Sequence, residues 1–102
     1  MISFLVAAVL SASASRGGYA AVHPHVIKNA TDAIATACET MRAHTPPKYV
    51  QYHKTCEKEF LATTGGRFWA LRQIMATPND PRGMRIILDA RDGHTISSVA
   101  MD

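Results

Sequence analysis

The sequence contains no catalytic signature and no glycine-rich phosphate loop, and only two of its 102 residues are cysteines. Because it has no paired C-x2-C spacing, a structural zinc site has little support. The net charge is +3, but basic and acidic residues are interspersed along the chain, unlike the concentrated basic stripe of a nucleic-acid binder. These absences predict a protein that is not an enzyme, needs no cofactor and does not bind nucleic acid.

Acidic residues are also missing from the start of the chain, where Asp32 is the first. An apolar run at 2–10 is followed by a stretch of alternating serine and alanine that ends at Arg16. This composition is typical of targeting segments, and it fits a secretory signal peptide about as well as an organelle-directed presequence. Residues 2–15 are too few to cross a bilayer as a helix. We therefore expect this leader to contact partner proteins or the membrane interface, through Phe4, Leu5, Val6, Val9 and Leu10.

Two stretches in the middle of the chain have the spacing of amphipathic helices. Apolar and small side chains recur at intervals of three and four in residues 27–41, and again in 49–63. The Thr-Pro-Pro sequence at 45–47 separates them, because proline cannot donate the backbone N–H that a helix interior requires. The sequence therefore predicts two antiparallel helices joined by a short turn.

Cys38 and Cys56 fall at about the same height on the facing sides of this predicted hairpin, which is a geometric condition for a disulfide. Two reduced, buried cysteines are the alternative. His53 lies near Cys56 on the second predicted helix, so these three residues are also weak candidates for a metal site. No fourth ligand is evident, and the prediction is a disulfide without a metal.

The rest of the chain predicts a third short helix and a β-hairpin. Residues 68–75 have helical spacing, with Trp69 at the edge as a candidate contact for partners. The β-favouring runs 84–88 and 95–99 flank an Asp-Gly turn signal. The expected fold is mainly α, with a leader at 1–22, a helical hairpin plus third helix at 23–76, and a loop and β-hairpin at 77–102.

The stretch 27–63 is similar in outline to the cysteine-stapled helical hairpins of the mitochondrial intermembrane space. Those proteins carry two cysteines per helix in a C-x9-C pattern, whereas each predicted helix here has one, Cys38 or Cys56. The resemblance is confined to architecture and implies a pair of antiparallel helices linked through their cysteines.

The sequence supports three functional hypotheses. The first is a non-catalytic accessory subunit of a large assembly, such as a respiratory-chain complex or the ATP synthase of the mitochondrial inner membrane. Its partners would be other protein subunits, with membrane-interface contact through residues 2–15 and a location in the inner membrane or intermembrane space. The second is a secreted, disulfide-stapled helical binding domain, supported by the leader and by a glycosylation sequon at Asn29. The third is a small RNA-binding or ribosomal protein.

Overall fold

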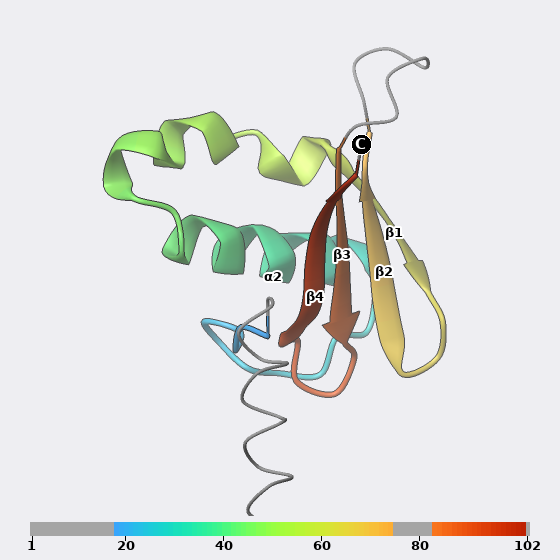
Figure 1. Ribbon diagram of the computed structural model, residues 1–102. Helices are drawn as coiled ribbons and strands as arrows, with labels where there is room; N and C mark the ends of the chain where they lie inside the picture. Colours follow the sequence, from blue (N-terminus) through green and yellow to red (C-terminus); the bar gives the residue numbers. More distant parts are fainter. Residues whose placement is uncertain (1–17, 75–82, 102) are drawn as a thin grey trace, which may run out of the picture.

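Within residues 18–74 and 83–101, which the computed structural model describes, one α-helix packs across one face of a four-stranded antiparallel sheet (Figure 1). Side chains are described up to Val99. The elements are α2 (Ala30–Ala43), the 3-10 helices η1 (Pro47–His53) and η2 (Cys56–Lys58), and the strands β1 (Phe60–Thr64), β2 (Phe68–Gln73), β3 (Gly83–Asp89) and β4 (Thr95–Met101). The strands follow one another across the sheet in chain order, and no helix in the described ranges is long and apolar enough to cross a membrane.

The expectation of a mainly α fold is wrong, because two of the three predicted helices are absent and the fold is mixed α/β. Residues 47–58 form only 3-10 turns, and residues 60–64 and 68–73 are strands that pair with each other. The glycine pair between them forms a hairpin turn, in which Gly65 N–H donates to the Phe68 carbonyl at 2.9 Å and Gly66 has a φ of 87°. The architectural resemblance to helical hairpins therefore does not extend beyond α2.

The physical reason for the error is visible in β2. Its buried side chains, Trp69 and Leu71, alternate with the exposed Phe68 and Arg72, which is the period of a strand. A short apolar run can satisfy both the helical and the strand period, and pairing with the strands on both sides decides between them. In η1, tyrosine and valine have a lower helix propensity than the residues of α2, which is rich in alanine.

Local signals define α2 well. Asn29 is its N-cap, and the Asn29 Oδ1 accepts a hydrogen bond from the Asp32 N–H at 2.8 Å. The helix ends at Ala43, shortly before the two prolines. The residues that it buries are small, which lets the helix backbone approach the sheet closely: Ala33, Thr36, Ala37, Cys38 and Thr40.

The core lies between α2 and the sheet, where Leu71 and Leu88 are completely buried. Trp69 is also part of this core, and its Nε1–H donates to the backbone carbonyl of Ile27 at 3.3 Å. Trp69 was expected to contact partners, and most of the residue is buried within the chain itself, with 9% exposed.

Two links hold η1 and η2 against α2. Cys38 and Cys56 form the predicted disulfide, with their Cα atoms 5.9 Å apart and both side chains buried. Arg42 donates to both carboxylate oxygens of Glu57, at 2.7 and 2.6 Å, and to the carbonyl of His53 at 2.8 Å. The Arg42 guanidinium thereby lowers the pKa of the Glu57 carboxyl.

The extended segment before α2 runs beside the turn between β3 and β4. Thr95 N–H donates to the Tyr19 carbonyl at 2.7 Å, and Ile27 N–H donates to the Ala90 carbonyl at 2.8 Å. Gly93 lies close to α2 with a φ of 81°, and a Cβ at this position would be 3.0 Å from the Thr36 side chain. The left-handed backbone angle therefore favours glycine, and a larger residue would also be tightly packed. The apolar leader positions predicted to contact partners lie outside the described residues: Phe4, Leu5, Val6, Val9 and Leu10.

His25 fastens this segment to the first turn of α2. Its Nδ1 donates to the His23 carbonyl at 2.6 Å, and its Nε2 lies 2.9 Å from both carboxylate oxygens of Asp32. Because both ring nitrogens act as donors, the imidazole is fully satisfied only when it is protonated. The hydrogen bond to Asp32, followed by the one to the His23 carbonyl, raises the pKa of His25 above its ordinary value of 6.5.

This pairing predicts a pH dependence of stability. A raised folded-state pKa stabilises the fold fully below the unfolded pKa, and the contribution is lost as the pH rises through the folded pKa. We expect Asp32→Asn to lower the urea midpoint more at pH 5.5 than at pH 8.5. The interaction of Asp32 with the helix N-terminus is present at both pH values, so the excess at pH 5.5 isolates the His25 pair. Equal differences at the two pH values would contradict this assignment.

Candidate functional site

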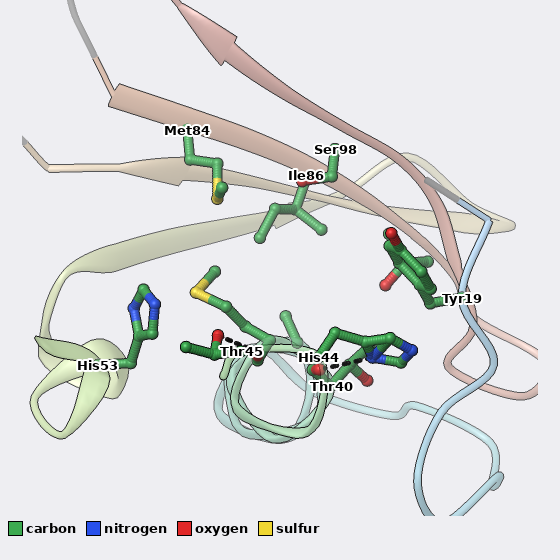
Figure 2. A pocket seen from close by; sticks show the side chains of 11 residues that line it. Tyr19, Thr40, His44, Thr45, His53, Met84, Ile86 and Ser98 are labelled. Carbon is green, nitrogen blue, oxygen red and sulfur yellow. Dashed lines mark hydrogen bonds between the residues drawn. The ribbon is translucent and has the colours of Figure 1, made fainter. Parts of the chain in front are cut away.

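A pocket of about 240 Å³ lies between the C-terminal half of α2 and the inward face of β3 and β4 (Figure 2). We call it the helix–sheet pocket. The N-terminal segment and η1 complete its wall. Its lining residues are Tyr19, Ala37, Thr40, Met41, His44, Thr45, His53, Met84, Ile86, Thr95 and Ser98.

The pocket exists because small side chains face each other across this part of the core. The strand register places Leu71, Ile86 and Ser98 in one inward row from β2 to β4. Leu71 and Ile86 are large, whereas Ser98 at the β4 end of the row is small. The helix also has small side chains on this side, Ala37 and Thr40. The row therefore fills the space near β2 and leaves it open near β4.

The inner wall of the pocket is apolar and adaptable. The side chains of Met84 and Ile86 point from β3 toward α2 (Figure 2), and Met41 lines the pocket from the helix side. Methionine has three rotatable bonds and a polarisable sulfur, so these walls can adjust to ligands of different shape.

Two of the polar side chains that line the pocket, His44 and Thr45, are already hydrogen-bonded to the end of the helix. His44 Nδ1 donates to the Thr40 carbonyl at 3.2 Å, and the Thr45 hydroxyl donates to the Met41 carbonyl at 2.6 Å. The Tyr19 ring packs against the His44 imidazole, with centroids 4.1 Å apart. Because the donor hydrogens of His44 and Thr45 are used in this way, the His44 Nε2 and the Thr45 oxygen remain as acceptors. A ligand that donates a hydrogen bond fits this arrangement.

The lining of the pocket includes no aspartate, glutamate, lysine or arginine. When its histidines are neutral, the pocket therefore carries no formal charge. The carboxyl and imidazole groups with shifted pKa values in the described part of the chain belong to local pairs elsewhere. These groups with a shifted pKa are His25, beside Asp32, and Glu57, beside Arg42, together with Asp89 and Asp92 in the turn between β3 and β4. A general acid–base pair with perturbed pKa values is therefore not found at the pocket.

The residues singled out from the sequence are placed in different parts of the fold. His53 lines the helix–sheet pocket, whereas Cys38 and Cys56 are bonded to each other and have no thiolate to offer a metal. Among residues 18–74 and 83–101, no cluster of three or more histidine, cysteine or acidic side chains could hold a metal ion.

Sequence reasoning missed most of the pocket. Thr95 and Ser98 gain their role from the register of β4 with β3, and Tyr19 gains its role from the backbone bridge to Thr95. The sequence did contain one signal, the polar Thr95 and Ser98 within a predicted strand. Polar residues at the inward positions of a strand indicate incomplete packing. Comparison of the chain with family models, with curated proteins and with solved structures found no match.

Proposed function

We propose that the chain is a non-catalytic binding domain of an oxidising compartment, which takes a small, neutral and largely apolar ligand in the helix–sheet pocket. The observation that carries the proposal is the pocket itself. It joins an apolar wall with a few hydrogen-bond acceptors and has no charged lining residue. This is the usual composition of sites that bind small molecules.

The compartment is inferred from the disulfide and from the leader composition. Disulfides persist in oxidising environments, and small secreted domains depend on them because their cores are small. The apolar and serine-rich leader fits export. The proposal thus develops the secreted binding domain, with a mixed α/β fold in place of a helical one. The C-terminal β-hairpin, which was predicted as an element separate from the rest of the chain, pairs with β2 in the chain's own sheet and is not left free for a partner subunit.

The size of the pocket suggests the class of ligand. An apolar cavity of roughly 150 Å³ holds one benzene molecule, and the helix–sheet pocket has about 240 Å³. A bicyclic aromatic compound with one N–H or O–H donor, of which indole is the simplest, matches this volume and the acceptors of His44 and Thr45.

Filling the pocket should abolish ligand binding. We expect indole to shift the methyl NMR signals of Met41 and Met84 in the unmodified chain, and Ser98→Leu to weaken this binding at least tenfold, because the leucine occupies the open end of the inward row. Ser97→Leu is the matched control, since Ser97 is the next residue along β4 and does not line the pocket. It should bind indole as the unmodified chain does.

The outcome that would overturn the proposal is equal affinity in the two leucine variants, or no saturable shift of either methionine. A second variant tests the site without changing its volume. Thr45→Val removes one acceptor, and the resulting loss of indole affinity should exceed the loss for naphthalene, which has no donor.

A further inference from the structure

The sheet has a second face, which α2 does not cover, and we call it the open face (Figure 1). The register aligns its side chains in rows across the strands. One row consists of Leu61, Arg72, Arg85 and Val99, one from each strand. All four side chains are exposed, including 51% of Leu61 and 56% of Val99. The row thus presents two central arginines flanked by aliphatic side chains.

The two arginines lie directly opposite each other on β2 and β3. Like charges in this position repel each other, which destabilises a sheet unless an anion lies between them. Within the described part of the chain, neither arginine has a carboxylate within ion-pair distance. Asp89, farther along β3, is already bound to Arg91 at 2.8 Å. Among the residues that the structure describes, this pair of guanidinium groups is therefore left without a neutralising carboxylate.

The surface beside the arginines is hollowed and partly apolar. A depression of about 300 Å³ lies over β1, β2 and β3, where the small side chain of Ala70 lies between Thr63 and Ile87, and Leu61 also lines it. Arg72 and Arg85 also line it. An anionic group can therefore sit between the guanidinium groups while an attached apolar portion lies over Ala70.

We propose that the open face binds the surface of a membrane that contains anionic phospholipids. Guanidinium groups bind phosphate through two parallel hydrogen bonds, and the flanking leucine, isoleucine and valine can contact the acyl region. This site is separate from the helix–sheet pocket and does not depend on the function proposed for that pocket.

Charge and side-chain type argue against two other occupants of the open face. A second copy of the chain would bring its own arginine pair against the first, and the two pairs would repel each other. Single-stranded nucleic acid binds through aromatic side chains that stack on bases. The residues that flank Arg72 and Arg85 in their row are the aliphatic Leu61 and Val99, which cannot stack in this way. The exposed Phe68 lies on the same face but four residues from Arg72, so it does not continue this row.

The test is co-sedimentation of the full chain with phosphatidylcholine vesicles, with and without 30% phosphatidylglycerol, as the salt concentration rises. We expect binding that depends on phosphatidylglycerol and weakens with salt. Arg72→Gln/Arg85→Gln should lower the apparent affinity at least tenfold, since each basic residue near an anionic surface contributes roughly fivefold. The leader is identical in all variants, so differences between them are due to the open face.

The matched control is Lys48→Gln/Lys54→Gln, which removes the same charge from the side of the molecule where η1 lies with α2 (Figure 1). It should change the affinity less than threefold. Equal losses of vesicle affinity in the two double variants would show that binding depends only on net charge, and this would overturn the proposal. Absence of vesicle binding, or tighter arginine-dependent binding to poly(U) than to vesicles, would overturn it as well. Unchanged or higher thermal midpoints of the arginine variants would show that they fold.

Discussion

Replacing Leu71 with alanine is expected to lower the free energy of unfolding by about 2 to 5 kcal/mol, the usual range for a buried leucine. Leu71 is completely buried at the β2 end of the inward row, and its strand lies between β1 and β3. Truncation removes apolar contacts and leaves a cavity that the surrounding strands can close only in part. The measurement is urea or guanidinium unfolding followed by tryptophan fluorescence, since Trp69 lies in the same core.

Leu61→Ala provides the matched control because it is the same chemical change on the opposite face of the sheet. Leu61 is 51% exposed on β1, so its truncation should change the unfolding free energy by less than about 1 kcal/mol. The contrast between these two leucines tests the assignment of Leu71 to the inward face and of Leu61 to the outward face of the sheet. Similar losses in the two variants would contradict the inward and outward assignment.

Removing the disulfide should destabilise the chain by about 3 kcal/mol. Cys38 and Cys56 are 18 positions apart, and a cross-link that closes a loop of this length restricts the unfolded chain by roughly this amount. For a domain of this size, the loss corresponds to a decrease of roughly 12 to 24 °C in the melting temperature. We expect this decrease for the double variant Cys38→Ala/Cys56→Ala.

Reduction of the unmodified chain separates the cross-link from the packing of the sulfur atoms. The reduced chain keeps both side chains, and its melting temperature should therefore fall most of the way to that of the double alanine variant. Alkylation of the native, unreduced chain followed by mass spectrometry should add no label. Two labelled thiols, or equal midpoints before and after reduction, would show that the cross-link does not stabilise the native chain.

The parts of the fold that the sequence could predict are those defined by neighbouring residues. Asn29 and the two prolines mark the ends of α2, and the Asp-Gly signal lies in the turn that joins β3 to β4. The cysteine pair was also predicted correctly, although for an incomplete reason. The chain does turn back after α2, and this return brings Cys56 to Cys38 through the short η2 helix rather than through a second long helix.

The remaining features depend on contacts between distant segments. Phe68, Trp69 and Leu71 fit a helix and a strand about equally well when considered alone, and only pairing with β1 and β3 selects the strand. The helix–sheet pocket and the arginine pair follow from this pairing. Arg72 and Arg85 meet only because β2 and β3 align in one register, and a shift by one residue would place their side chains on opposite faces.

The bridge between Tyr19 and Thr95 has a consequence for the order in which the chain folds. It joins the first described segment to the last strand, so this backbone pairing cannot form until β4 has been synthesised. The loop between Cys38 and Cys56 is far shorter and can close earlier, because closure entropy rises with loop length. During synthesis, therefore, oxidation of the cysteines can precede completion of the sheet. The pairing of Tyr19 with Thr95 joins residues that are distant in sequence, so we expect it to form late in folding.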